Sequence, residues 1–258
     1  MRIVIAGGTG TVGRHIAVVA GRREHELTVL ARSTGVDLTD GAQLEDKLRG
    51  ADAVIDVTSI ATRSAKASRK FFAQVTSNLL DAGQAAGVRH HLILSIVGSD
   101  RAPFGYYSGK QLQEEMVRSG PVPWTILRTT QFHEFAQQIY GRVKFGQASI
   151  VPRMISQPVA AREVAQRLVQ LAEAGPGGHV SDLAGPEVLR MIDMVRSYAA
   201  ASGANGPILE VPLPGGFGRA IRDGTLTAGT AATLSTLTYA DWIEEIRSGR
   251  TPAPDADV

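Results

Sequence analysis

The first fifteen residues contain glycines at a spacing that suits the binding of a phosphate group. Gly7, Gly10 and Gly13 follow an apolar run at residues 3–6 and open a segment, 11–20, with the pattern of a helix. In such a unit one glycine makes the turn, a second lets the backbone approach a pyrophosphate, and a third lets the helix pack against the strand. The N-terminus of the helix adds free N–H groups and a partial positive charge. The sequence therefore predicts a dinucleotide site, and a glycine-rich turn without a ligand is the alternative.

A second candidate group follows the next predicted strand, 26–31. An acidic residue at this place binds the ribose 2′-hydroxyl of NAD, whereas an arginine accommodates the 2′-phosphate of NADP. The chain has Arg32 and Ser33 here, and the first acidic residue after them is Asp37. A guanidinium forms bidentate, charge-assisted hydrogen bonds with a phosphate. The sequence therefore favours NADPH over NADH, with a solvated surface arginine as the alternative.

Apolar and amphipathic segments alternate through the first half of the chain and must position these groups. This alternation indicates βαβ units, a parallel sheet and right-handed crossovers, which together make a doubly wound α/β sheet of the Rossmann type. Further strands are expected at 51–57, 91–97 and 124–127, and helices at 41–49, 66–86 and 106–118.

The second half is less regular. It predicts helices at 161–173, 188–201 and 239–247, a strand at about 179–183, a loop at 215–218 and a tail from Thr251 without a structural signal. We therefore expect a dinucleotide-binding domain at 1–132. Residues 133–258 are expected to form mostly a substrate-binding lobe, with the late strand returning to the sheet.

Composition excludes several classes of function. The 258 residues include no cysteine, which excludes disulfides, thiolate catalysis and cysteine-ligated metals. The net charge of +2, with acidic and basic residues mixed, argues against nucleic acid as a partner. The six histidines have no metal-ligand spacing. No apolar run reaches the ~20 residues that span a bilayer, and the chain starts directly in a strand, so we expect a cytoplasmic protein without a membrane partner.

Four further segments carry a resemblance to a known family. They are 77–82 with 87–89, then 91–98, 123–132 and 184–187. Together with the G-x-x-G-x-x-G spacing of the first turn, they resemble the atypical, NmrA-like branch of the short-chain dehydrogenase/reductase superfamily. The resemblance extends over nearly the whole chain. It implies a Rossmann fold, an NAD(P) cofactor and hydride transfer.

The resemblance also implies roles for individual residues. Tyr106 and Lys110 match the Tyr-x-x-x-Lys pair, in which the lysine holds the nicotinamide ribose and lowers the pKa of the tyrosine. The tyrosine then donates a proton as hydride arrives. A surface aromatic is the alternative for Tyr106, and a helix cap or turn former is the alternative for Asp37. The residues expected to contact the cofactor are Gly7, Thr9, Gly10, Thr11, Val12, Gly13, Arg32, Ser33, Asp37, Leu38, Val57, Thr58, Ser59, Ser95, Lys110, Thr130 and Phe132.

One position departs from the pattern of the superfamily. Aligned on Ser95, the usual third member of the catalytic set falls at Ile96 or Val97, and neither side chain can donate a hydrogen bond. The standard catalytic set is therefore incomplete. We predict an NADPH-dependent reductase acting on a small carbonyl, enone or quinone. The alternatives are a non-catalytic redox-sensing regulator that binds NADP(H) and, with less support, an NAD-dependent epimerase or isomerase.

Overall fold

The computed structural model describes residues 1–204 and 206–250. The chain divides into two compact units. The first consists of Met1–Arg128 and Arg162–Ser181, and the second of Thr129–Ala161 and Asp182–Val258. Among the described residues, none of the helices combines the length and the apolar character that crossing a bilayer requires.

A parallel sheet forms the centre of the first unit. Its main strands are β1 (Arg2–Ala6), β2 (Glu26–Leu30), β3 (Ala53–Asp56), β4 (His91–Ile96) and β5 (Trp124–Thr129). Their order is β5-β4-β3-β1-β2, and the short strand β9 (Gly178–His179) pairs with β5. Ile3 lies opposite both Leu27 and Ala53, in parallel register. The predicted parallel α/β sheet of Rossmann type is confirmed, and its parallel strands bring their carboxyl ends to one edge.

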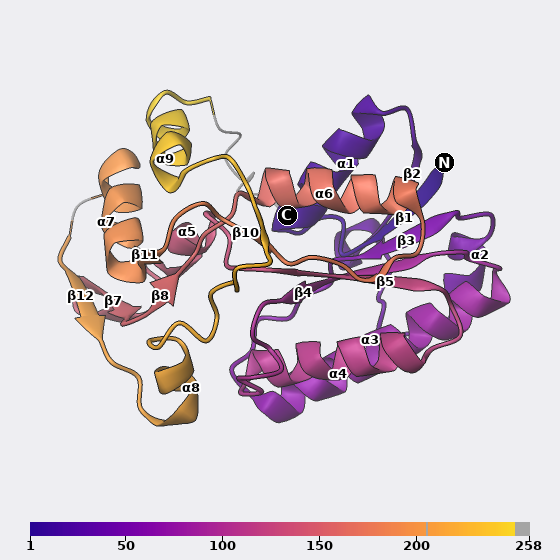
Figure 1. Ribbon diagram of the computed structural model, residues 1–258, viewed down its shortest axis with the longest axis horizontal. Helices are drawn as coiled ribbons and strands as arrows, with labels where there is room; N and C mark the ends of the chain where they lie inside the picture. The colour runs from indigo at the N-terminus through magenta and orange to yellow at the C-terminus, as the bar shows by residue number, and fades with distance from the viewer. Residues whose placement is uncertain (205, 251–258) are drawn as a thin grey trace. The chain divides into compact units, whose positions relative to one another are not determined.

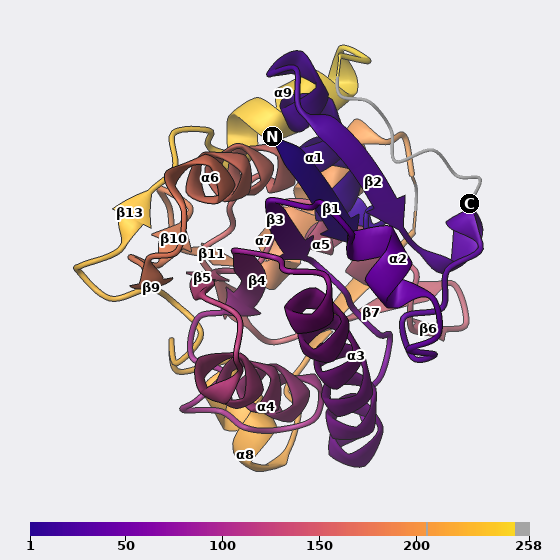
Figure 2. The same cartoon turned by 90° about the vertical axis from the view of Figure 1, so that its right-hand side faces the viewer.

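Helices cover both faces of this sheet. They are α1 (Thr11–Arg22), α2 (Leu44–Leu48), α3 (Ala65–Ala85), α4 (Tyr106–Ser119) and α6 (Ala161–Ala174), with a 3₁₀ turn, η1 (Arg32–Thr34), after β2. Figure 1 shows α1 and α6 on one face and α3 and α4 on the other, and Figure 2 shows the same arrangement from the side. Phe72 and Leu79 of α3 and Ile55 of β3 are fully buried. Burial on both faces explains why the strands are continuous apolar runs.

The second unit is built from shorter elements. One small sheet has the order β12-β7-β6, and the strand β8 pairs antiparallel with β11. Leu183 of β10 lies opposite Thr129, and β10 also pairs with β13. The helices are α5 (Phe135–Ile139), α7 (Met191–Ala201), α8 (Gly215–Ala220) and α9 (Tyr239–Arg247), and the strands are β6 (Lys144–Phe145), β7 (Ala148–Pro152), β8 (Ile155–Ser156), β10 (Leu183–Ala184), β11 (Leu189–Arg190), β12 (Ile208–Val211) and β13 (Thr233–Leu234).

Three expectations for the second half of the chain were wrong in detail. The single strand at 179–183 is two short strands, β9 and β10. The helix expected from residue 188 begins at Met191, because residues 189–190 pair with β8 instead. The loop expected at 215–218 is helix α8, in which a Cβ atom on Gly218 would lie 1.9 Å from the Leu213 carbonyl oxygen. Glycine there permits close packing rather than breaking the helix. The tail from Thr251 lies outside the described residues.

Candidate functional site

The glycine turn after β1 is shaped by two close backbone approaches. Gly7 has φ +83°, and a Cβ atom on it would lie 3.0 Å from the backbone of Thr58, which follows β3. A Cβ atom on Gly13 would lie 2.4 Å from the carbonyl oxygen of Gly7. At Gly10 the nearest atom is the same oxygen, at 3.3 Å. Glycine at 7 and 13 is therefore needed for the fold itself, whereas Gly10 is exposed and a Cβ atom there would make one tight contact, with that oxygen.

The N-terminus of α1 is suited to an anion. Gly10 is the N-cap residue, no side chain caps it, and the first turn carries no acidic residue. The first N–H groups of a helix lack partners within the helix and carry the positive end of its dipole. The Oγ of Ser33, just after β2, donates to the Oγ1 of Thr9 over 3.3 Å, which brings this residue next to the glycine turn. The residues present therefore fit a pyrophosphate at the start of α1.

The segment after β2 contains several residues that were predicted to contact the cofactor. The side chain of Arg32 is exposed. The Asp37 carboxylate accepts from the backbone N–H and the hydroxyl of Thr39, at 2.9 and 2.8 Å. These bonds hold the pKa of Asp37 below its ordinary value, the backbone bond first. Asp37 is therefore a turn former in this structure. Leu38 is buried, and its carbonyl accepts from the side chain of Asn78 over 2.9 Å.

A buried network below the end of β3 was missed by the sequence reasoning. Asp56 is 0% exposed and accepts from the backbone N–H of Thr58 over 2.9 Å. The Gln113 side chain donates to Asp56 over 2.7 Å and accepts from the Lys110 ammonium. The available signal was a carboxylate inside the apolar run 51–57, because a charge in a buried strand requires partners. Lys110 thus lies in the interior, and Gln113 and Asp56 link it to the loop that follows β3.

Tyr106 lies at the same sheet edge. Its hydroxyl is 3.1 Å from the Oγ of Ser59, and its ring packs edge-on against Phe72, with centroids 5.6 Å apart. Burial raises the pKa of Tyr106 to about 12, the Ser59 bond lowers it, and the charge of Asp56 raises it further. The resemblance implies a lowered pKa for this phenol, but burial outweighs that effect here. A phenol with this pKa stays protonated at neutral pH, so it can donate a proton.

The pKa of Lys110 is shifted in the opposite direction. The side chain is 3% exposed, and its Nζ lies 4.7 Å from the centroid of the Phe72 ring. Burial lowers the pKa of Lys110 to about 8, while the charges of Asp56 and Glu114 raise it. The structure therefore brings Tyr106 and Lys110 together around Phe72, on the face of α4 that packs against α3.

Two serines near the end of β4 have buried hydroxyls. Ser95 is 1% exposed and Ser99 is 0% exposed, and neither Oγ has a hydrogen-bond partner among the described residues. A buried hydroxyl without a partner costs about 1–3 kcal/mol, so such a group suits a ligand that completes it. Ser95 shares the sheet face of Ile93, because side chains alternate along a strand. Val97 is 2% exposed and supplies no donor.

The last predicted cofactor residues belong to the second unit. The buried Thr130 donates its hydroxyl to the carbonyl of Gln157, and Phe132 forms a parallel bridge with Val159. The neighbouring His133 is 0% exposed, and its ring centroid lies 5.4 Å from that of Tyr239. Thr130 and Phe132 thus have local structural partners, and their cofactor contacts stay predictions.

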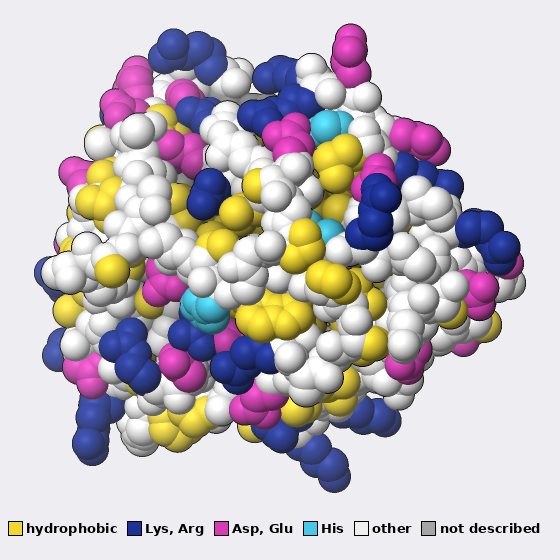
Figure 3. Space-filling model, turned by 45° about the vertical axis from the view of Figure 1, so that its right-hand side comes forward, with side chains coloured by type: hydrophobic (Ala, Val, Ile, Leu, Met, Phe, Trp, Pro, Cys, Tyr) yellow, Lys and Arg dark blue, Asp and Glu magenta, His cyan; other side chains and the backbone are white. Residues whose placement is uncertain are grey.

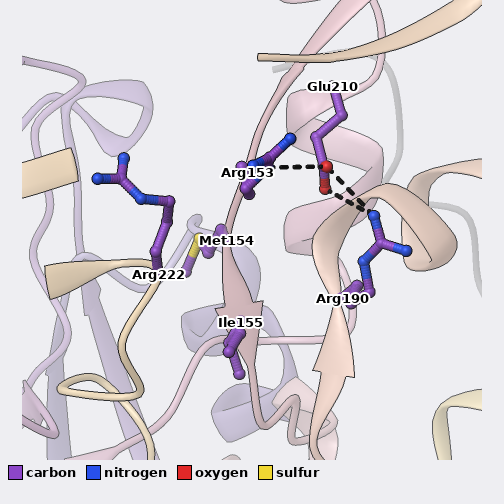
Figure 4. Close-up of a pocket in the computed structure, with 6 residues that line it drawn as sticks. All are labelled: Arg153, Met154, Ile155, Arg190, Glu210 and Arg222. Atoms are coloured by element: carbon purple, nitrogen blue, oxygen red, sulfur yellow. Dashed lines mark hydrogen bonds and ion pairs between the residues drawn. The ribbon is translucent and has the colours of Figure 1, made fainter. Parts of the chain in front are cut away.

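Other groupings of polar residues give less support for a ligand site. A cavity of about 210 Å³ in the second unit is lined by Arg153, Met154, Ile155, Arg190, Glu210 and Arg222. Arg153 and Arg190 bind Glu210, while the guanidinium of Arg222 points away from it (Figure 4), so the positive charges do not converge. On the face drawn in Figure 3, basic and acidic side chains are interspersed. Within residues 1–204 and 206–250, no cluster of His, Asp and Glu is arranged to hold a metal ion.

The chain is similar to several known proteins. Residues 7–174 match the family described as NAD(P)H-binding. The chain is 24% identical to the Photosystem II assembly factor Ycf39 of Synechocystis sp., over 83% of this chain and 71% of that protein. An NADPH-dependent quinone oxidoreductase of Escherichia coli has the same fold, with a TM-score of 0.65, 18% identity and 95% and 99% of the two chains covered. The UDP-glucose 4-epimerase of Bifidobacterium longum, solved with NAD⁺ and UDP, has a TM-score of 0.72 at 14% identity, with 99% of each chain covered.

Proposed function

We propose that this protein, which belongs to the NAD(P)H-binding family, is a reductase that transfers hydride from NADPH to a small carbonyl, enone or quinone. One observation carries the proposal. The Tyr106 hydroxyl is bonded to Ser59, and Ser59 belongs to the segment after β3 whose backbone packs against Gly7 of the dinucleotide turn. A protonated phenol at the edge of a dinucleotide site is the group that a carbonyl reduction requires.

Different residues of the first unit bind different parts of the cofactor in this proposal. The glycine turn and the N-terminus of α1 bind the pyrophosphate. Arg32 and Ser33 bind the 2′-phosphate, which gives the preference for NADPH. Ser95 offers its buried hydroxyl to the nicotinamide end. When bound, NADPH supplies the hydride.

The chemistry at Tyr106 is proton donation. Its hydroxyl gives a proton to the oxygen of the acceptor, and Ser59 holds that hydroxyl in place. Because Ile96 and Val97 provide no second donor, the acceptor is oriented less tightly than in a complete catalytic set. A quinone suits such a site, since it can take its protons from water and needs mainly proximity to the hydride.

A non-catalytic regulator that binds NADP(H) is the second candidate, and one observation favours it. The Lys110 ammonium is bonded to Gln113 inside the first unit, so in this structure it points toward protein groups. The name of the Synechocystis relative, an assembly factor, describes no chemistry.

A substrate panel separates the two candidates. NADPH binding is first measured by calorimetry on the wild type and on Gly10→Val, which should fold but lose binding. NADPH oxidation is then followed at the nicotinamide absorbance with quinones, enones, ketones and imines. Turnover with one class, absent in Gly10→Val, supports the reductase. Tight binding without turnover on any class supports the regulator, and absence of binding refutes both.

A further inference from the structure

We propose that Asp56 and Gln113 are positioning residues, which hold the Lys110 ammonium and thereby fix the segment 57–59 against the dinucleotide turn. The inference rests on the proposed binding of NADPH and assigns roles to two residues outside the Tyr-x-x-x-Lys pair. Neither residue is placed in contact with the cofactor. They act through Lys110 and through the loop after β3.

A continuous chain of hydrogen bonds carries this inference. The Lys110 ammonium donates to the Gln113 side-chain oxygen, and the Gln113 amide donates to Asp56 Oδ2 over 2.7 Å. The other oxygen of Asp56 accepts from the backbone N–H of Thr58 over 2.9 Å. Lys110, Gln113 and Asp56 are 3%, 0% and 0% exposed. At this burial each bond is shielded from water, and the loss of one partner leaves the next group unsatisfied.

The charges around Lys110 single out Asp56 as its counter-ion. From its own helix, Lys110 is influenced by Glu114, but that carboxylate forms a two-bond pair with Arg128 of β5, at 2.8 and 2.6 Å. From α3 it faces the ring of Phe72, which carries no charge. The carboxylate of Asp56 is bonded to amide groups, and among residues 1–204 and 206–250 no cation forms an ion pair with it.

Other titratable groups near Asp56 do not replace Lys110. On β4, His91 is fully buried, and burial lowers its pKa even though the charge of Asp56 raises it. Tyr106 stays protonated, because its pKa is raised to about 12. Between pH 7 and 10 the group that changes charge in this network is therefore Lys110, whose pKa is lowered to about 8.

The network ends at the dinucleotide turn. The backbone of Val57 and Thr58 lies 3.0 Å from the position of a Cβ atom on Gly7. The next residue, Ser59, bonds the Tyr106 hydroxyl over 3.1 Å. Loss of the ammonium proton removes the positive charge that balances the buried Asp56 carboxylate, and the neutral amine that is left donates to Gln113 more weakly. Movement of the segment 57–59 should then weaken NADPH binding and displace Tyr106 together.

The test measures the NADPH dissociation constant from pH 7 to 10 in the wild type, Asp56→Asn and Asp81→Asn. This range avoids the 2′-phosphate, which titrates near pH 6. The wild type should lose affinity with a midpoint near the pKa of Lys110, about 8. Removal of a nearby counter-charge shifts a pKa by about 1 unit or more, so Asp56→Asn should move the midpoint to lower pH. Asp81 is an exposed acid on α3, so Asp81→Asn should leave the midpoint unchanged.

A second variant and a second readout keep the test decisive if Asp56→Asn fails to fold. Gln113→Met keeps the length of the side chain but removes the acceptor of the Lys110 ammonium, so the midpoint should move to lower pH. The Lys110 side-chain NMR signal, assigned from Lys110→Met, reports the same pKa without NADPH. An unchanged Lys110 pKa in both variants overturns the inference. A shifted pKa in a protein that binds no NADPH overturns the proposed function but keeps the network.

Discussion

Gly13 of α1 packs directly on Gly7, because a Cβ atom at position 13 would lie 2.4 Å from the Gly7 carbonyl oxygen and 2.5 Å from the Cα of Gly8. At Gly10 the corresponding distance to the same oxygen is 3.3 Å, and its backbone angles, φ −74° and ψ 176°, suit any residue. The two glycines therefore serve different purposes. Gly13 allows the helix to meet the strand, and Gly10 leaves space in front of the helix N-terminus.

Substitutions at these glycines should separate stability from binding. Gly13→Ala should lower the free energy of unfolding by about 3 kcal/mol, because its methyl group meets backbone atoms that cannot move aside cheaply. Gly10→Val should lose less stability than Gly13→Ala, because its Cβ atom meets a single backbone oxygen at 3.3 Å, but it should bind NADPH weakly or not at all. Urea unfolding and calorimetric titration measure the two effects. Micromolar NADPH binding by Gly10→Val would place the pyrophosphate elsewhere.

Arg32 should set the cofactor preference. If Arg32 binds the 2′-phosphate as proposed, Arg32→Ala removes charge-assisted bonds worth about 1.5–3 kcal/mol, so the Kd for NADPH should rise roughly 10- to 150-fold. The Kd for NADH should change little. Arg22→Ala, at an exposed arginine in the last turn of α1, is the control. Equal affinities of wild type and Arg32→Ala for NADPH would make Arg32 a solvated surface residue.

Much of this arrangement could be predicted from the sequence because it depends on local patterns. The parallel sheet follows from apolar runs alternating with helices, and α9 was predicted with its observed bounds from Trp242 and Ile246, of which Trp242 is buried and Ile246 half-buried. The role of Asp56 could not be predicted in the same way. Its partner Gln113 is far along the chain, and the hydrogen bond between them exists only once α4 packs against α3 and β4.

The second half was harder to predict because its elements are short. A two-residue strand such as β10 has no periodicity to detect, and its pairing with Thr129 is a tertiary contact. Helix α8 contains three glycines in six residues, a composition that normally indicates a loop. Its close approach to the Leu213 carbonyl, which requires Gly218, has no sequence signature.

The contributions of Tyr106 and Ser59 can be separated by paired variants. Tyr106→Phe and Ser59→Ala each remove the same 3.1 Å hydrogen bond, but only Tyr106→Phe removes the proton donor. With a ketone acceptor, kcat should fall more in Tyr106→Phe than in Ser59→Ala. With a quinone the loss in Tyr106→Phe should stay well below the ~100-fold that aligned acid catalysis gives. Equal losses of kcat in both variants with the ketone would show that Tyr106 has only a structural role.

Lys110 should matter more than Tyr106 for the quinone reaction. Lys110→Met keeps the length of the side chain but removes the donor to Gln113, so both KM for NADPH and kcat should worsen. Steady-state kinetics on Lys110→Met and Tyr106→Phe give the comparison. A thousandfold loss of kcat in Tyr106→Phe, beside a mild effect of Lys110→Met, would contradict this and show that the tyrosine acts as a full acid catalyst.

The stability of the protein should depend on pH through Lys110. Its pKa is about 8 in the folded state, below the value of about 10.4 in an unfolded chain, so the unfolded state binds more protons between these two values. The free energy of unfolding should therefore rise from pH 8 to 10 relative to Lys110→Met, in which this contribution is missing. Chemical denaturation at a series of pH values measures the difference. Parallel pH curves for the two proteins would show that Lys110 has an ordinary pKa.

Transfer of the hydride itself is the most direct measurement of the proposed activity. NADPH carrying deuterium at the transferred position of its nicotinamide is incubated with the enzyme and the best acceptor from the panel, and the product is examined by mass spectrometry. With an enone, ketone or imine, deuterium should appear on carbon in the reduced product with wild type and be absent with Gly10→Val. With a quinone, whose hydroquinone O–H groups exchange with water, the readout is slower oxidation of the deuterated NADPH than of ordinary NADPH. Bound NADPH that delivers no deuterium to the carbon of an enone, ketone or imine, and that is not oxidised by a quinone, would contradict the reductase.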